Sequence, residues 1–129
     1  MCGRYTNKLT WSEIVALYRL TLDVPPHNLR PRFNGCPTDP IDVVTERDGK
    51  REYGRMRWGL IPSWWSKAIK ELRMATFNAR AETVTTKPVF RNAFKRSRCL
   101  IPVSGYYEWQ DTPGEKPSTA SGGDISPVD

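Results

Sequence analysis

Histidine and paired cysteines are nearly missing from this sequence of 129 residues. His27 is the only histidine, and it lies in a Pro-Pro-His-Asn loop. A lone histidine disfavours catalytic triads and dyads that use imidazole as the general base. The three cysteines, Cys2, Cys36 and Cys99, are far apart in the sequence and form no Cys-x-x-Cys pair. A disulfide framework and a tetrahedral zinc site are therefore not expected, and we expect neither a metal nor a cofactor.

Long apolar runs and a secretory start are also lacking. No run approaches the roughly 18–20 residues that cross a bilayer. The N-terminal Met-Cys-Gly-Arg-Tyr-Thr has neither the basic start nor the apolar stretch of a secretory signal. A chain of this length is typical of one domain. We therefore expect a soluble, intracellular protein without a membrane partner, in the cytoplasm or nucleoid if its source is bacterial.

Acidic residues are scarce in the middle of the chain. Residues 50–98 carry thirteen Lys/Arg and three Asp/Glu, whereas residues 1–49 are balanced and residues 99–129 have a net charge of −4. Six aromatic side chains lie within this basic block: Trp58, Trp64, Trp65, Phe77, Phe90 and Phe94. Such a mixture suits a polyanion that also offers flat bases, and so indicates a nucleic acid. A solvated basic face on an ordinary alkaline protein explains the composition equally well.

The first part of the sequence predicts one helix and one irregular loop. Thr10-Trp11-Ser12-Glu13 resembles a capping box, and apolar residues follow it at helical spacing. A helix is therefore expected near residues 11–22, and Pro25-Pro26 excludes its continuation. Residues 27–40 are rich in Pro, Asn and Gly and are too irregular to assign.

A β-hairpin is expected next. Residues 41–45 read as a strand, Asp48-Gly49 as a tight turn and residues 51–59 as the return strand. Because successive residues of a strand point to opposite sides, the return strand has an apolar face and a cationic face. These faces consist of Gly54, Met56 and Trp58 on one side and of Arg55 and Arg57 on the other. We assign Trp58 to the core.

The second half of the sequence predicts short elements. Residues 77–80 form a short strand or loop, and Lys87-Pro88 opens a helix with cations near its C-terminal end. A strand is expected over residues 98–103, a turn at Ser104-Gly105 and a second strand over residues 106–110. Cys36 and Cys99 are read as small buried apolar residues.

Cys2 is the residue with the most distinctive chemistry. A small residue after the initiator methionine is what methionine aminopeptidases accept, so we expect a mature chain that begins at Cys2. An N-terminal cysteine is a 1,2-aminothiol: its amine can form a Schiff base with an aldehyde, and its thiol can close onto the same carbon as a thiazolidine. The α-amine has a pKa of about 8, so roughly a tenth of it is neutral at pH 7. The competing interpretation is that Cys2 is an incidental small residue.

Five ordered blocks of sequence carry a family resemblance. They are Met1-Cys2-Gly3-Arg4-Tyr5, Arg32-Phe33-Asn34, Trp58-Gly59-Leu60-Ile61-Pro62-Ser63-Trp64-Trp65, Asn78-Ala79-Arg80-Ala81-Glu82-Thr83, and Arg98 to Trp109. Together they resemble the SRAP family, the SOS-response-associated peptidases or abasic-site processing proteins, over residues 1 to about 117. The resemblance implies an α+β domain with a strongly bent, barrel-like β core and peripheral helices. It also implies a basic groove for single-stranded DNA that contains abasic sites.

The resemblance also implies roles for individual residues. Cys2 corresponds to the nucleophile that links to the ring-opened abasic sugar, Asn78 to the residue that holds the amino terminus or the sugar, and Glu108 to the acid/base. A carboxylate beside aromatic rings can have a raised pKa and so move the protons that Schiff-base chemistry requires. Asn78 in a turn and Glu108 on a solvated strand face are the plainer interpretations. The expected DNA-binding residues are Arg4 and Arg80 for phosphates, and Trp64, Trp65 and Trp109 for stacking on bases.

The sequence departs from the family pattern after the Tyr-Glu-Trp block. The family domain continues with further core strands and a histidine that assists Schiff-base formation and reversal, whereas here the sequence becomes polar. We therefore expect residues 1–111 to be the N-terminal part of one domain, incomplete at its C-terminus, and residues 112–129 to be a disordered tail. The strand over residues 98–103 should then expose apolar side chains. A frameshifted or truncated reading frame and a natural short variant both explain the departure.

Four functions follow from these features. The first is covalent capture of abasic sites through Cys2. The second is a thiol autopeptidase that removes what precedes its own Cys2. The third is a catalytically impaired single-stranded DNA-binding remnant, and the fourth is a fragment that does not fold stably.

Overall fold

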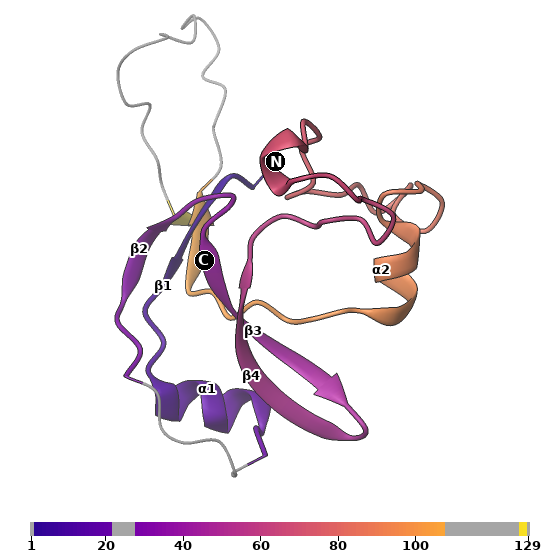
Figure 1. Cartoon of the computed structure of the whole chain (residues 1–129). Helices are drawn as coiled ribbons and strands as arrows, with labels where there is room; N and C mark the ends of the chain where they lie inside the picture. The colour runs from indigo at the N-terminus through magenta and orange to yellow at the C-terminus, as the bar shows by residue number, and fades with distance from the viewer. Residues whose placement is uncertain (1, 22–27, 108–126, 129) are drawn as a thin grey trace, which may run out of the picture.

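The computed structural model describes residues 2–21, 28–107 and 127–128. Its strands form two antiparallel sheets, one with the order β2-β1-β5-β6 and one formed by the β3–β4 hairpin (Figure 1). The elements are β1 (Arg4–Asn7), α1 (Trp11–Tyr18), β2 (Arg32–Gly35), β3 (Pro40–Arg47), β4 (Lys50–Arg57), the 3-10 helix η1 (Ile69–Glu71), α2 (Arg91–Arg96), β5 (Gly105–Tyr107) and β6 (Pro127–Val128). The mixed α+β class is confirmed. Within the described ranges the two sheets stay separate and close no barrel.

Helix α1 begins with the expected capping box. The Thr10 side chain accepts a hydrogen bond from the Glu13 N–H, and the Glu13 carboxylate accepts one from the Thr10 N–H. The pKa of Glu13 is lowered because its carboxylate accepts hydrogen bonds from the backbone N–H and from the hydroxyl of Thr10. The helix is shorter than predicted because Arg19 takes a left-handed conformation, with φ of 49°, and ends it. Beyond the helix, the Thr21 N–H donates to the Arg51 carbonyl and so ties this end to β4.

The hairpin is confirmed. Asp48 and Gly49 both have positive φ, 51° and 75°, as the favoured two-residue hairpin turn requires. Strand β3 buries both of its faces, with Ile41 and Val43 on one side and Val44 on the other. The division of β4 into an apolar and a cationic face is wrong in detail. Tyr53 lies on the arginine face and packs on α1, while Met56 is exposed.

Two small clusters form the core. The first contains Tyr5, Ile41 and Val43, with Trp58 packed against it, as predicted for that tryptophan. The second contains Ile14, Leu20 and Val44 between α1 and the hairpin, where the Trp11 and Tyr53 rings also meet edge to face at 5.1 Å.

Strands β1 and β2 are not predicted by the sequence. They are four residues long and pair antiparallel, with Tyr5 opposite Gly35. A Cβ at Gly35 would collide with the Tyr5 ring, so this close approach requires glycine. The sequence indicates only an irregular loop over residues 27–40, because a strand as short as β2 carries little periodicity.

The predicted strand over residues 98–103 is also different. Only Leu100 forms a β-bridge there, exchanging backbone hydrogen bonds of 2.8 and 2.9 Å with Val44. Leu100, Ile101 and Val103 have exposed fractions of 59%, 40% and 42%, which confirms the expected exposure. Helix α2 begins three residues after Pro88, and Lys95 and Arg96 lie in its last turn as predicted.

Residues 77–80 form a loop. Most of the predicted tail, residues 112–129, lies outside the described residues; within it, Pro127–Val128 pairs with β5 as β6. None of the helices among the described residues is long and apolar enough to cross a membrane.

Candidate functional site

The candidate site is an apolar cavity of about 340 Å³ beside the start of β1. Strands β1, β3 and β5, the end of the hairpin, and the loops around residues 77 and 102 contribute to its wall. The lining residues are Cys2, Tyr5, Ile41, Trp58, Phe77, Asn78, Ile101, Val103 and Tyr106. Cys2 and Asn78, two of the three predicted catalytic residues, therefore share one cavity.

A direct hydrogen bond joins these two residues. The Asn78 side-chain amide donates from Nδ2 to the Cys2 carbonyl oxygen over 2.7 Å, across 76 residues of sequence. The Cys2 thiol lies 3.6 Å from the Arg4 carbonyl oxygen and can donate a weak hydrogen bond to it. Asn78 thus holds the carbonyl of Cys2, while the Cys2 thiol faces the backbone of Arg4.

Trp58 holds the loop that carries Asn78. Its indole Nε1 donates to the Phe77 carbonyl over 3.1 Å, and its ring meets the Tyr5 and Phe77 rings edge to face. The Leu60 N–H also donates to the carbonyl of the buried Thr76. The chain just before Asn78 is therefore fixed to the end of the hairpin. The sequence predicts a core position for Trp58 but not this contact; the one signal for it is that the indole N–H of a partly buried tryptophan normally requires an acceptor.

The predicted phosphate-contact residues lie at the surface. Arg4 is exposed, and its guanidinium donates to the Asn34 side-chain oxygen over 2.6 Å. This neighbour orients Arg4 without neutralising it, because an amide carries no charge. Arg80 is exposed at the start of a turn, where its carbonyl accepts hydrogen bonds from Thr83 and Val84. The sequence alone predicts no role for the Arg32-Phe33-Asn34 block, whereas in the structure Asn34 orients Arg4.

Trp64 and Trp65 lie on the loop that follows the hairpin, and neither lines the Cys2 cavity. Their rings are in edge contact at 6.2 Å, and Trp65 donates from Nε1 to the Ala68 carbonyl over 3.4 Å. Trp64 is 52% exposed. The pair thus offers an aromatic surface outside the cavity.

Two of the predicted site residues, Glu108 and Trp109, lie outside the described residues, as does His27. For the internal cysteines the prediction was wrong: Cys36 is only partly buried and Cys99 is exposed. Their segments carry irregular backbone next to the surface, where a small residue is not enclosed. In the part of the chain that the structure describes, no three His, Cys, Asp or Glu residues lie close enough to hold a metal ion.

The walls of the cavity were not predicted as a site. Phe77, Ile101, Val103 and Tyr106 look like ordinary core residues in the sequence. The alternation of Ile101 and Val103 was the one available signal, because it places both side chains on the same side of an extended segment.

The sequence of this chain matches a known protein family and several of its members. The sequence model described as SOS response associated peptidase (SRAP) matches residues 1–123. The abasic site processing protein YoaM of Bacillus subtilis is 34% identical over 110 residues, which cover 85% of this chain and 48% of YoaM. The abasic site processing protein HMCES of Mus musculus is 39% identical over 133 residues, covering 88% of this chain and 38% of HMCES. The chain thus spans about half the length, or less, of these curated relatives.

Solved structures have the same fold. A protein from Bacteroides thetaiotaomicron superposes with a TM-score of 0.71 at 25% identity, over 88% of this chain and 51% of that one. A protein from Bordetella bronchiseptica superposes with a TM-score of 0.60 at 24% identity, over 83% of this chain and 50% of that one.

Proposed function

This chain belongs to the SOS response associated peptidase family, and on that premise we propose that it captures abasic sites in single-stranded DNA through a covalent bond to Cys2. The observation that carries the proposal is the 2.7 Å hydrogen bond from Asn78 to the Cys2 carbonyl, between two residues that line one apolar cavity. Relatives that are named abasic site processing proteins support the choice of lesion.

The proposed reaction uses both reactive groups of Cys2 after removal of Met1. The α-amine adds to the C1′ aldehyde of the ring-opened sugar, and the resulting carbinolamine loses one water to form an imine. The thiol then adds to the imine carbon, its proton passes to the nitrogen, and a five-membered thiazolidine closes. One water leaves in total, and the step is redox-neutral. An intact nucleotide has no aldehyde, so the chemistry itself selects the lesion.

Asn78 acts in this proposal by positioning. A cysteine at the end of a chain has free backbone rotations, and the amide of Asn78 removes some of them by holding the carbonyl. Pre-organisation of a nucleophile lowers the entropy that must be lost on the way to the transition state. Trp58 and Phe77 present apolar ring surface to the cavity, while Phe77 and Tyr106 remain partly open to solvent, at 37% and 39% exposure.

Proton transfer is assigned to Glu108, as the sequence predicts. The amine must lose a proton and the departing hydroxyl must gain one, so one carboxyl that exchanges protons can serve both steps. Glu108→Gln should slow conjugate formation while leaving reversible DNA binding in place.

Reversible binding would come from the surface around the cavity. Arg4 and Arg80 are exposed cations beside the two segments that meet at Cys2 and Asn78, and both can contact phosphates. Trp64 and Trp65 can stack on bases of the same strand.

A conjugation assay tests the proposal. Mature protein is incubated with single-stranded DNA that contains one abasic site, and intact mass spectrometry should detect the sum of the two masses less one water. Cys2→Ala should abolish the heat-stable conjugate. Cys36→Ala and Cys99→Ala are the matched controls, because they remove a thiol elsewhere, and both should react like the wild type.

A second variant separates the two bonds. Cys2→Ser keeps the α-amine but loses the thiol, so it should form an imine that borohydride reduction traps. Without borohydride, this variant should give no stable conjugate, because it cannot close the thiazolidine ring. Equal yields of untreated conjugate from wild type, Cys2→Ala and Cys2→Ser would overturn the proposal. Salt-dependent binding without any conjugate would instead favour the DNA-binding remnant.

The autopeptidase alternative needs the same cysteine. Intact mass of Cys2→Ala and Glu108→Ala variants, produced in a host that lacks methionine aminopeptidase, reports whether Met1 is removed by the chain itself. Normal processing of both variants would contradict that alternative.

A further inference from the structure

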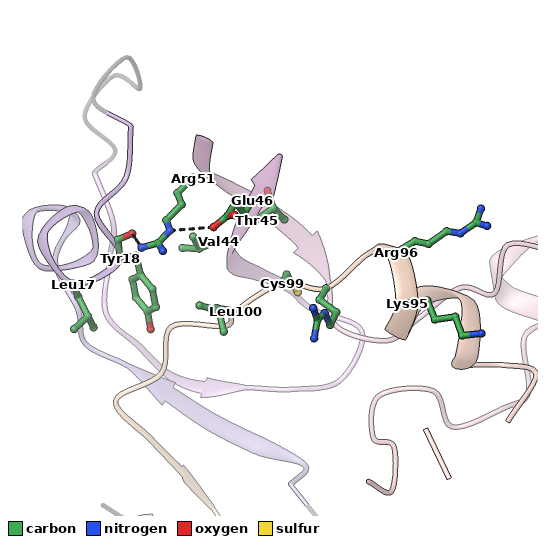
Figure 2. Close-up of a pocket in the computed structure, with 11 residues that line it drawn as sticks. Leu17, Tyr18, Val44, Thr45, Glu46, Arg51, Lys95, Arg96, Cys99 and Leu100 are labelled. Carbon is green, nitrogen blue, oxygen red and sulfur yellow. Dashed lines mark hydrogen bonds and ion pairs between the residues drawn. The ribbon is translucent and has the colours of Figure 1, made fainter. Parts of the chain in front are cut away.

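A second cavity, larger and basic, lies between α1, the hairpin and the segment that follows α2 (Figure 2). Its volume is about 690 Å³. We call it the basic cleft and define it by its charged lining residues: Glu46, Arg51, Lys95, Arg96 and Arg98. The side chains of Leu17, Val44 and Leu100 add apolar surface at the Arg51 end of the cleft, with the Tyr18 ring among them.

The charges of this cleft do not cancel. Glu46 is its only acidic lining residue, and this carboxylate is already paired with Arg51 at 3.3 Å. Arg51 is held further by donating to the Tyr18 carbonyl over 3.1 Å. Among the described residues, Lys95, Arg96 and Arg98 have no carboxylate within salt-bridge distance. Three net positive charges therefore line the cleft, and we expect them to attract an anion.

The arrangement of these cations favours an extended anion. In Figure 2, Arg51 lies near Tyr18 at one end, and Lys95 and Arg96 project from α2 at the other. The Arg98 guanidinium lies over the Phe94 ring, 5.9 Å from its centre, which restricts its position. A single phosphate would need converging donors, whereas a strand of nucleic acid presents a row of phosphates with a base beside each one. The exposed side chain of Leu100 gives such bases an apolar surface.

The basic cleft is separate from the Cys2 cavity. Leu100 lines the cleft, whereas its neighbours Ile101 and Val103 line the Cys2 cavity. In β3, likewise, Val44 lines the cleft and Ile41 lines the Cys2 cavity. The two cavities share no lining residue, so they are separate hollows.

We propose that the basic cleft is a second nucleic-acid backbone site, which binds undamaged single-stranded DNA away from the Cys2 cavity through Lys95, Arg96 and Arg98. The inference rests on the proposed function in taking DNA as the ligand. It adds that the protein holds the strand, or a second segment of DNA, at a place where no chemistry occurs. Long DNA that reaches both sites then binds more tightly than a short strand that fills one.

The test measures reversible binding of undamaged DNA by the full chain. Fluorescence anisotropy is recorded over a salt series with oligothymidylates of about 6 and about 24 nucleotides. Replacing Lys95, Arg96 and Arg98 together by alanine should lower the salt slope for the long strand by about 2, because each phosphate contact on a single strand contributes about 0.7. Affinity at low salt should fall by on the order of tenfold or more.

A matched control removes three cations elsewhere. Lys67→Ala, Lys70→Ala and Arg73→Ala together take the same charge from exposed positions outside the cleft. This control should change the slope for the long strand by clearly less than the cleft variant does. Equal losses in both variants would overturn the inference, because they would reflect net charge alone.

Two further measurements keep the outcome clear. If the triple variant loses its near-ultraviolet circular dichroism, Lys95→Gln with Arg96→Gln replaces it, which leaves Arg98 over Phe94. Polyglutamate that competes with oligothymidylate equally well at equal charge would overturn the assignment to nucleic acid.

Conjugation separates this inference from the proposed function. The triple variant should still form the Cys2 conjugate with a short abasic oligonucleotide at the wild-type rate. Absence of conjugate in the wild type would overturn the proposed function, whereas the measured binding of undamaged DNA would still test the basic cleft. An unchanged salt slope in the triple variant would overturn the proposal that the basic cleft binds DNA, and it would leave the proposed Cys2 conjugate unaffected.

Discussion

At the scale of the residue, the site depends on contacts between segments that are distant in sequence. The sequence identifies Cys2 by its place after Met1 and Asn78 by its block, but it contains no information on their distance. The hydrogen bond between them exists because Trp58 holds the loop at Phe77 to the end of the hairpin. Residue types could therefore be predicted here, and their meeting could not.

Asn78 provides a prediction at this scale. Asn78→Ala removes the donor to the Cys2 carbonyl, and one such hydrogen bond is worth about 1 kcal/mol. We expect conjugation with saturating abasic DNA to slow by about fivefold, with little change in the affinity for undamaged DNA. Single-turnover conjugation measures the first and anisotropy the second.

Asn34→Ala is the control for that experiment. It removes the acceptor that orients Arg4 and lies outside the Cys2 cavity, so it should weaken reversible binding without slowing conjugation at saturation. If Asn78→Ala and Asn34→Ala had the same effect on both measurements, Asn78 would have no positioning role.

At the scale of the element, local signals predicted the capped helix and the hairpin, because each depends on residues close in sequence. The helix begins at the capping box of Thr10 and Glu13, and the hairpin turns at Asp48 and Gly49. The four-residue strands β1 and β2 were not predicted, since their stability depends on pairing with each other and not on a periodic pattern. The strand predicted at residues 98–103 failed for a related reason: apolar β-forming residues make a strand only where a partner is present.

Tyr53 gives the hairpin a pH dependence. Its hydroxyl donates to Asp42 over 2.6 Å, and burial, followed by this carboxylate, raises its pKa well above the ordinary value of 10.0. A raised tyrosine pKa stabilises the fold fully below about pH 10, and this stabilisation is lost as the pH rises through the folded-state value. We expect the melting temperature to fall in that alkaline range, and to fall less steeply in Tyr53→Phe.

Tyr106→Phe is the comparison for this change, because its ring is exposed at 39%. Thermal melts at pH 8 and in the alkaline range measure the effect. The prediction fails if the melting temperatures of Tyr53→Phe and of the wild type fall by the same amount between those pH values. Burial also raises the pKa of Tyr5, so some alkaline dependence should persist in Tyr53→Phe.

At the scale of the whole molecule, the two clusters of the core are small and a strip of apolar surface is left uncovered. Leu100, Ile101 and Val103 form this strip, on a segment that pairs through one bridge only. The chain spans about half the length of its curated relatives. Exposed apolar side chains next to unpaired backbone favour association between chains.

A self-association experiment follows. Leu100→Thr with Val103→Thr replaces two exposed apolar side chains by the more polar, β-branched threonine. We therefore expect less concentration-dependent association in light scattering. Phe33→Thr, which removes an exposed aromatic residue in β2, is the control and should have a smaller effect. An unchanged association in the double variant would show that the strip is not the contact surface.

The sequence by itself determined the local features: the position of Cys2 after Met1, the capped helix, the hairpin turn, the basic block of residues 50–98 and the family to which the chain belongs. These follow from residues that act where they stand or over a few positions. Only the tertiary structure decided that Asn78 holds Cys2, that aromatic rings line their cavity, and that the cations at the end of α2 and just after it line a separate cleft. Each of those facts depends on packing between distant segments, where side-chain shape and hydrogen-bond partners, rather than sequence spacing, select the neighbour.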